Sequence, residues 1–235
     1  MKKLVLLSFS FLVIFSGCKK DDSNPTPPPS PSIPTVGLVS YYPFNGNAND
    51  ESGNGRNGTV NGAILTSDRF GSINKAYYFD GISNYIECND AISFNSFSIA
   101  VWVNTSPNNS TRKEIINGGD YFVTDKGYHI YKENNVARFD LSNHPSTVSS
   151  SIIGNGNWTF LVCICDGGFL KLYINGNLES TSSGTASISP LKLLIGCDQP
   201  KNKSSFWIGK IDDIRIYNRA LNTTEIQQLY HENGW

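Results

Sequence analysis

A loop near the start of the folded region is rich in side chains that carry oxygen. Between residues 47 and 57 these side chains are Asn47, Asn49, Asp50, Glu51, Ser52, Asn54 and Asn57, with two glycines among them. Flexible loops of this kind wrap Ca²⁺ with carboxylate, amide and backbone oxygens. The same residue types also build turns for conformational reasons alone, because Asn and Asp bond to their own backbone. The segment therefore predicts either a calcium-binding loop or a purely structural turn.

Aromatic side chains are the second group that could contact a ligand. A sugar site needs an apolar ring on which the sugar stacks and nearby polar groups that take its hydroxyls. The candidates are Trp102, Tyr121, Tyr128, His129, Tyr131 and Trp207. Trp102 comes first, because alternation places it on the more polar face of its strand, which we take as the concave face. Tyr128 and His129 come next, in the middle hairpins.

The first residues have the pattern of an export signal. Lys2 and Lys3 form a basic start, and an apolar run from Leu4 to Phe15 follows. Such a run of about a dozen residues is too short to span a bilayer, so residues 1–17 are predicted to be a signal peptide. The small residues before Cys18 resemble the lipobox of bacterial lipoproteins. In that motif the chain is cut directly before the cysteine, which is then acylated. The alternative is an ordinary cleaved signal that contains a cysteine.

The segment that follows is a spacer. Residues 18–35 contain the predicted acylated Cys18, a Lys-Lys-Asp-Asp cluster and many prolines. Prolines favour the extended polyproline conformation, so the segment forms a semi-rigid tether. The charged cluster resembles the export signal of surface lipoproteins in some Gram-negative lineages. We therefore expect a lipid-anchored protein of the outer membrane, exposed at the cell surface.

Composition assigns the rest of the chain, residues 36–235, to one large all-β domain. Charges are sparse and of mixed sign, with a net charge of −1, which argues against nucleic-acid binding. Four cysteines follow Cys18, namely Cys88, Cys163, Cys165 and Cys197. A disulfide between Cys88 or Cys197 and a strand cysteine, and four buried free thiols, are both compatible with the sequence.

Strands and turns fill nearly the whole domain. Residues 96–104 alternate between apolar and more polar side chains, and 158–165 are apolar on both faces, as in a central strand. Residues 169–174 lead into Asn175 and Gly176, a hairpin signal. Short strands separated by such turns predict a two-sheet sandwich or jelly roll. One helix is predicted at the end, capped by Asn222, and we expect it at the edge of the sandwich.

An ordered set of segments resembles a known family. The segments are Tyr42 to Thr59, Ala76 to Glu87, Phe97 to Val103, Trp158 to Gly176 and Ile208 to Ile226. They resemble the laminin-G-like, concanavalin A-like lectin/glucanase jelly roll of bacterial surface proteins. The resemblance implies that Trp102 and Trp158 are core positions. It also implies a structural calcium held by Asp50, Asp212 and Asn54. Pairing of the first and last strands would bring Asp212 and Asp213 near that loop.

Glycan cleavage in this family depends on a Glu-x-Asp-x-x-Glu pattern, which places two carboxylates on one strand face. The chain lacks it. The nearest match, Glu87 to Asp90, has no second glutamate, and Glu114 and Glu133 stand alone. The histidines, His129, His144 and His231, have no recognisable nucleophile beside them. We therefore predict no catalytic residues and no enzyme activity.

These observations lead to one interpretation with two alternatives. The chain is interpreted as a surface lipoprotein whose domain binds a polysaccharide or glycoconjugate without cleaving it. The first alternative is a protein-binding adhesion or structural module of a surface complex. A glycoside hydrolase with a divergent site ranks last.

Overall fold

The computed structural model describes residues 32–89, 94–105, 111–120, 126–141, 147–185, 192–198 and 203–235. The predicted signal peptide, Cys18 and the tether as far as residue 31 lie outside the described residues, as does Tyr121. Within the described part, no helix is both long and apolar enough to cross a bilayer.

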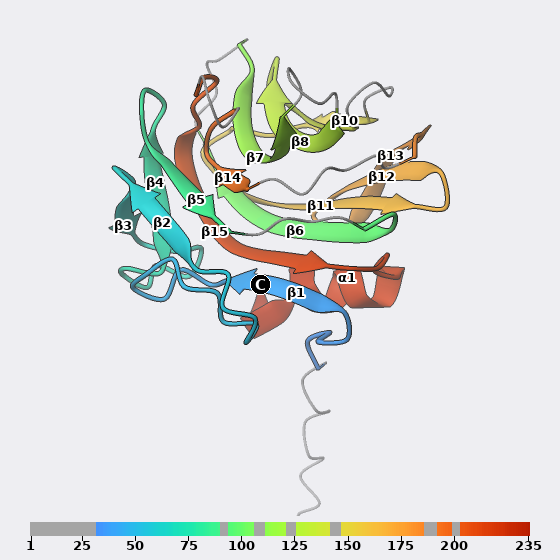
Figure 1. The fold of residues 1–235 in the computed structure, drawn as a ribbon, viewed down its shortest axis with the longest axis horizontal. Helices are drawn as coiled ribbons and strands as arrows, with labels where there is room; N and C mark the ends of the chain where they lie inside the picture. Colours follow the sequence, from blue (N-terminus) through green and yellow to red (C-terminus); the bar gives the residue numbers. More distant parts are fainter. Residues whose placement is uncertain are drawn as a thin grey trace, which may run out of the picture. The chain divides into compact units, whose positions relative to one another are not determined.

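The described residues form two antiparallel sheets that face each other (Figure 1). Sheet A has the order β13-β12-β11-β6-β15-β4-β3, with β1 also paired to β15. Its strands are β1 (Leu38–Tyr42), β3 (Ile64–Thr66), β4 (Ala76–Asp80), β6 (Phe97–Asn104), β11 (Trp158–Asp166), β12 (Phe169–Ile174), β13 (Asn177–Ser183) and β15 (Ile208–Tyr217). Sheet B has the order β10-β9-β8-β7-β14-β5-β2. Its strands are β2 (Gly58–Asn61), β5 (Tyr85–Cys88), β7 (Lys113–Asp120), β8 (Lys126–Glu133), β9 (Val136–Leu141), β10 (Thr147–Ile152) and β14 (Leu193–Ile195).

A helix, α1 (Thr223–Tyr230), and a 3₁₀ turn, Glu232–Gly234, complete the chain. The prediction of an all-β, two-sheet jelly-roll sandwich with a short C-terminal helix is confirmed. The expected capping residue is also present. The Asn222 side chain accepts a bond from the N–H of Glu225, and the Glu225 side chain accepts one from the N–H of Asn222. This reciprocal pair satisfies N–H groups that the first helical turn leaves without intrahelical partners.

The first strand pairs with the last, as expected from the sequence. Tyr41 lies opposite Arg215 and Tyr42 opposite Ile214 in the β1–β15 ladder. On its other side β15 pairs with β6, and the register shifts between Asp212 and Arg215. This β-bulge bends the strand. The bulge lies at the junction of β1, β6 and β15.

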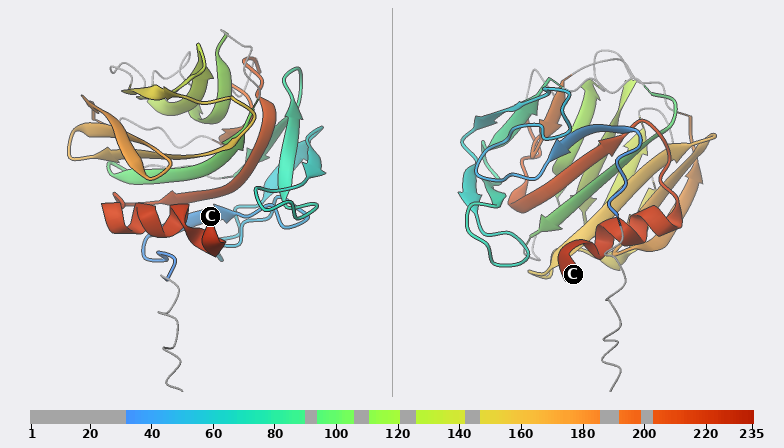
Figure 2. Two further views of the ribbon diagram at one scale, coloured as in Figure 1. Left: turned by 180° about the vertical axis from the view of Figure 1, so that it is seen from behind. Right: turned by 90° about the horizontal axis from the view of Figure 1, so that it is seen from below.

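Alternation along β6 divides the buried surface into two layers. The side chains that enter the main core between the sheets are Phe97, Ile99, Val101 and Val103. Ala100 and Trp102 point to the opposite, outer face of sheet A. There they meet Ile226 and Leu229 of α1, which lies across this face (Figure 2). The helix therefore covers a face of the sandwich, not its edge as we expected, and the Trp102 face is not an open concave surface.

Local turns follow the predicted chemistry. Asn175 and Gly176 link β12 to β13 with φ values of 48° and 78°. A two-residue hairpin of this type needs positive φ at both positions, which Asn and Gly adopt most easily. All four cysteines of the domain are buried free thiols. Of the two alternatives compatible with the sequence, the structure has the free thiols, which pack as small apolar side chains.

Candidate functional site

A pocket of about 350 Å³ opens beside the paired strands β1 and β15. Its walls come from the segment after β1, from residues 68–75 and from the residues that follow α1. The lining residues are Tyr41, Pro43, Asn45, Asp68, Arg69, Phe70, Ser72, Lys75, Asp212, Asp213, Glu232 and Asn233. We call this hollow the Arg69 pocket.

The wall between β3 and β4 is shaped by one aspartate. The Asp68 carboxylate accepts hydrogen bonds from the N–H groups of Phe70, at 2.9 Å, and of Ser72, at 2.8 Å. These bonds hold a turn in which the Phe70 ring remains 43% exposed. Lys75 closes the rim by donating to the amide oxygen of Asn45 at 2.7 Å. Asx turns of this kind fix loop geometry without a regular ladder.

The floor of the pocket is a buried charge network. Arg69 contacts Asp212 through Nη1 at 3.2 Å and Asp213 through Nη2 at 2.9 Å. Arg215 contacts Asp213 at 3.0 Å and Glu232 at 2.8 Å. Both arginine side chains are 3% exposed. A planar guanidinium with several donors suits such a network, because one arginine can bind two carboxyl groups.

The network balances its charges by keeping one carboxyl group protonated. Burial, and then the charge of the neighbouring Asp213, raises the pKa of Asp212 to about 8. At neutral pH Asp212 is therefore mainly uncharged, and Arg69 donates a hydrogen bond to a neutral acid. Burial and the charge of Asp213 also raise the pKa of Glu232. Arg69 and Arg215 thus share the floor with three carboxyl groups, and in two of these, Asp212 and Glu232, burial disfavours the charged form.

The backbone is strained at the same place. Asp213 has a φ of 53°, a left-handed conformation that costs energy for a residue other than glycine. The strain coincides with the bulge in β15 and lets consecutive residues, Asp212 and Asp213, both line the pocket. Strained positions are concentrated at functional sites. A concave pocket that also contains a perturbed carboxyl group is a good candidate for ligand binding.

An apolar ring and several amides complete the pocket. Phe70 is half exposed, and its ring lies edge-on to that of Trp235 at 6.0 Å between centroids. Asn45 and Asn233 bring amide groups to the lining. A ring beside donors and acceptors is the combination that a sugar needs for stacking and for its hydroxyls. Phe70 was not predicted from the sequence, because it lies in the turn between β3 and β4 and not in an alternating strand segment.

The predicted calcium ligands have protein partners. Burial raises the pKa of Asp50, but the N–H groups of Arg56, Tyr41 and Ser52 outweigh it and hold the pKa below its ordinary value. The Asn54 amide nitrogen donates to the carbonyl of Val39 at 2.9 Å. Asp212 is bound by Arg69, as described above. The calcium site stays a prediction, and these partners favour the alternative, a loop shaped for conformational reasons.

The predicted sugar-stacking rings are buried. Trp102 is fully buried between Phe160 and Trp235, with centroids at 5.0 and 4.9 Å. Tyr128 lies in the main core against Phe97. A Cβ on Gly118 would lie 2.0 Å from the Tyr128 ring, so this glycine makes room for it. Trp207 is also fully buried. None of these three rings offers a face to a sugar in this conformation.

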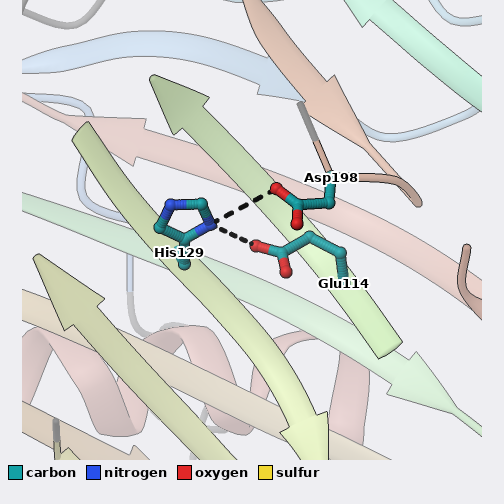
Figure 3. Close-up of side chains that lie close together, drawn as sticks. All are labelled: Glu114, His129 and Asp198. Carbon is teal, nitrogen blue, oxygen red and sulfur yellow. Dashed lines mark hydrogen bonds and ion pairs between the residues drawn. The ribbon is translucent and has the colours of Figure 1, made fainter. Parts of the chain in front are cut away.

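A second polar cluster lies on sheet B and includes the predicted ligand residue His129. Figure 3 shows its three members, Glu114 on β7, His129 on β8 and Asp198 just after β14. His129 Nδ1 lies 2.9 Å from Glu114 Oε1 and 3.9 Å from Asp198 Oδ1. All three residues are buried, and their ligand atoms lie within 4.8 Å of one another. The three side chains could therefore hold a metal ion.

Neighbouring side chains orient this cluster. Arg112 donates from Nε and Nη2 to Glu114 Oε2 at 3.0 and 2.9 Å, which leaves Oε1 directed at His129. Asn117 donates to Asp198 Oδ1 at 3.2 Å, and its amide oxygen accepts the N–H of Gly119. Burial raises the pKa of Glu114. The two carboxylates therefore differ in their hydrogen-bond donors: Glu114 is bonded by the guanidinium of Arg112, and Asp198 is bonded by the uncharged amide of Asn117.

The spacing of Glu114, His129 and Asp198 in the sequence did not indicate that they lie together. Glu114 and His129 are brought together by the β7–β8 hairpin, in which Asn117 lies opposite His129. Asp198 arrives from the end of β14, a strand inserted between β5 and β7. Alternation does set His129 on the face opposite Tyr128 and Ile130, which is a usable signal. The contribution of Asp198 depends on the order of strands in the sheet, which the sequence pattern does not contain.

Comparison with solved structures finds the same fold in sugar-binding proteins. Domain 4 of an extracellular GH43 arabinanase from Geobacillus stearothermophilus, solved with arabinotriose, has a TM-score of 0.64 at 22% identity, over 82% of this chain and 98% of that domain. A botulinum neurotoxin serotype D ligand-binding domain, solved with N-acetylneuraminic acid, has a TM-score of 0.68 at 17% identity, over 85% of this chain. The chain spans about half the length of the toxin domains it matches, 52% in this case.

A family model supports the same assignment from the sequence. No curated protein sequence matches the chain. Residues 80–227, more than half of the chain, match the model described as the concanavalin A-like lectin/glucanases superfamily. This segment runs from the end of β4 into α1 and so contains both the His129 cluster and most of the Arg69 pocket floor. The resemblance that the ordered segments indicated is thereby confirmed, and the chain belongs to the concanavalin A-like lectin/glucanase superfamily.

Proposed function

We propose that this protein is a non-catalytic carbohydrate-binding module that takes a polysaccharide or glycoconjugate. The single observation that carries the proposal is the Arg69 pocket, in which the half-exposed Phe70 ring lies beside amide and hydroxyl groups. The fold is shared with a domain solved with arabinotriose and with one solved with N-acetylneuraminic acid. The sugar would stack on Phe70 and bond to Asn45, Ser72 and Asn233.

The contacts of the pocket carboxyl groups support binding without cleavage. A glycosidase needs one carboxyl group free to attack or to activate water and a second one to protonate the leaving group. Asp213 is bound by both Arg69 and Arg215, and Glu232 is bound by Arg215. Asp212 is protonated but is bonded to Arg69. These side chains hold one another, which is the behaviour of a structural network.

The test is a glycan-array screen of the purified protein, run in Ca²⁺ and again in EDTA. The variant Phe70→Ala should weaken binding about tenfold or more, because removing an aromatic anchor at the centre of a site costs at least about 1.4 kcal/mol. Phe169→Ala is the matched control, since Phe169 is 52% exposed and lies outside the pocket.

The array has four informative outcomes. Selective binding that Phe70→Ala abolishes and Phe169→Ala retains supports the proposal. Binding that survives Phe70→Ala places the sugar elsewhere on the domain. A blank array with folded protein contradicts glycan binding and favours protein adhesion. Loss of binding in EDTA alone would show that a metal ion supports the site.

For adhesion, the specific observation is an exposed apolar strip at one end of sheet A. Ile64 lies opposite Tyr78, and Ile208 lies opposite Asp80, so the four share the outer face. Ile64 is 61% exposed, and the nearby Ile82 is 75% exposed. Exposed apolar groups beside a short edge strand can mark a protein contact. Ile64→Ser would weaken capture by a protein partner and would leave a glycan array unchanged.

For its place in the cell, we propose a lipid anchor at Cys18, outside the described residues, and exposure at the surface of the outer membrane. The support is the basic start, the short apolar run and the proline-rich tether in the sequence. Cys18→Ser should abolish labelling by radioactive palmitate and release the protein from membranes. Digestion of the domain by protease added to intact cells tests surface exposure, and full protection would contradict it.

A further inference from the structure

We infer that Glu114, His129 and Asp198 form a binding site for a divalent transition-metal ion of the zinc class. Each contributes one ligand atom, and the atoms come from three separate segments, β7, β8 and the residues after β14 (Figure 3). The site shares no side chain with the Arg69 pocket. It therefore stands whether or not that pocket binds sugar.

The spacing of the three atoms suits a small tetrahedral ion. Zinc binds nitrogen and oxygen at about 2.0–2.2 Å, so two ligands of a tetrahedral site lie about 3.3–3.6 Å apart. His129 Nδ1 lies 2.9 Å from Glu114 Oε1 and 3.9 Å from Asp198 Oδ1, one value on each side of that range. Shifts of less than about 1 Å therefore bring these pairs to the spacing of a tetrahedral site.

The ligand types select among metals. Calcium and magnesium take oxygen ligands, whereas an imidazole nitrogen suits zinc and its first-row neighbours. A set of one histidine and two carboxylates therefore favours a transition metal over the calcium that the loop at Asp50 suggests. Three protein ligands leave a fourth position, which a water molecule can fill.

The surroundings hold the ligands in place. Arg112 bonds to Glu114 Oε2, so that Oε1 is the atom that faces His129. Asp198 is held by a backbone bridge to Ser204. Ligating carboxylates are usually hydrogen-bonded in this way by groups behind them. The Asn117 amide nitrogen lies 3.2 Å from Asp198 Oδ1 and 3.0 Å from His129 Nδ1, so it contacts two of the proposed ligand atoms and turns aside when a metal ion binds.

Charge also favours a cation. Glu114 is fully buried and Asp198 is nearly so, yet the described residues place a single guanidinium, that of Arg112, against this pair. Of the two carboxylates, Arg112 bonds to Glu114, whereas Asp198 has the Asn117 amide at 3.2 Å and His129 Nδ1 at 3.9 Å. Two carboxylates removed from water need more positive charge than one arginine supplies, and His129 or a metal ion can contribute it. A bound metal ion would supply it and would tie the segment after β14 to the β7–β8 hairpin.

The test uses the tag-free full chain, first stripped of metal and then melted with Zn²⁺, Mn²⁺, Ca²⁺ or EDTA. Zn²⁺ at about a hundred times its Kd should raise the Tm by about 5–10 °C, because it binds the folded state only. Ca²⁺ should leave the Tm unchanged. Co²⁺ should bind in a one-to-one ratio and give the visible absorption of a tetrahedral site.

Two variants and their controls separate this site from stray binding. His129→Gln and Glu114→Gln should lose the Zn²⁺ shift and the Co²⁺ absorption. His231→Gln and Glu133→Gln should keep both, since these side chains lie outside the cluster. If the first two variants do not fold, the Co²⁺ spectrum of the unmodified protein decides. A folded protein with neither the Tm shift nor the absorption overturns the inference, as does a shift that survives His129→Gln.

Discussion

Two buried clusters in this domain differ in how the charge of their carboxyl groups is compensated. In the Arg69 pocket, the carboxyl groups of Asp212, Asp213 and Glu232 are all bound by arginines. In the sheet B cluster, Arg112 binds Glu114, and Asp198 has the Asn117 amide as its partner. The first cluster contains its own cations. In the second cluster, the metal ion that we propose would supply further positive charge when it binds.

The difference shows where a binding site can form in a buried charge network. A guanidinium that already bonds to a carboxylate blocks that oxygen from a metal, and a protonated carboxyl group such as Asp212 is a weaker ligand still. The Arg69 network therefore stabilises the floor of the pocket, above which we propose that the ligand binds. In the sheet B cluster, His129 Nδ1 faces a carboxylate oxygen of Glu114 and one of Asp198, and the neutral Asn117 amide lies beside them. Buried carboxylates alone do not indicate a metal site. The number of arginines that are already bonded to those carboxylates is the more useful signal.

The largest expected effect comes from a substitution that breaks the Arg69 network. Arg69→Met keeps most of the side-chain volume but leaves Asp212 and Asp213 side by side without their shared cation. Removing one partner of a buried ion pair costs about 3–5 kcal/mol of unfolding free energy. Urea unfolding monitored by tryptophan fluorescence measures it. Arg138→Met is the control, because its pair with Glu133 is partly exposed and such pairs contribute about 0–1 kcal/mol. Equal losses in both variants would contradict a special role for the Arg69 network.

A smaller effect sharpens the comparison with a carboxylate that is held by backbone N–H groups. Asp50 accepts N–H groups from Tyr41, Ser52 and Arg56 at 3.0, 2.9 and 3.0 Å. Asp50→Ala leaves these donors unbonded and should cost about 1–3 kcal/mol. The loss should be the same in Ca²⁺ and in EDTA, as measured by thermal melting, and Glu51→Ala should change little. A Tm that rises with Ca²⁺ in the unmodified protein, and not in Asp50→Ala, would instead establish the predicted calcium site.

The last effect depends on pH and concerns the proton on Asp212. Its folded pKa of about 8 lies above the unfolded value, which is about 3.9. The folded state therefore binds an extra proton between these two values, and stability falls as the pH rises through this window. Asp212→Asn should remove this part of the decline, so its stability relative to the unmodified protein should rise as the pH increases from 5 to 8. Denaturant unfolding from pH 5 to 9 measures the slope, and parallel curves for the two proteins would refute the raised pKa.

Much of the fold could be predicted because it depends on local chemistry. Asn175 and Gly176 specify a hairpin through their dihedral preferences, and Asn222 with Glu225 specifies a helix start. The alternation along β6 correctly put Trp102 on the face opposite Val101 and Val103. What covers that face could not be predicted, because the contact between α1 and Trp102 joins segments more than a hundred residues apart.

The candidate sites were less predictable for the same physical reason. Closure of β1 on β15 was expected, and it brings Asp213 beside Tyr41. The partner of Asp212 and Asp213, however, is Arg69 from a turn far away in the sequence, and nothing in its local spacing indicates it. Glu114 was taken as isolated, since a hairpin and an inserted strand are needed to bring it to His129 and Asp198. Residue types identify possible ligands, and the order of strands decides which of them meet.

The way the chain enters the domain has a mechanical consequence. Tyr217 donates its hydroxyl to the carbonyl of Pro34 at 3.0 Å, and Arg219 donates to that of Val36 at 2.8 Å. A pull on the chain ahead of these residues would load these two bonds first and then the β1–β15 ladder. Bonds of an antiparallel ladder run across the strands, so a pull along β1 loads them together in shear. The first strand can therefore bear tension along its length as a unit.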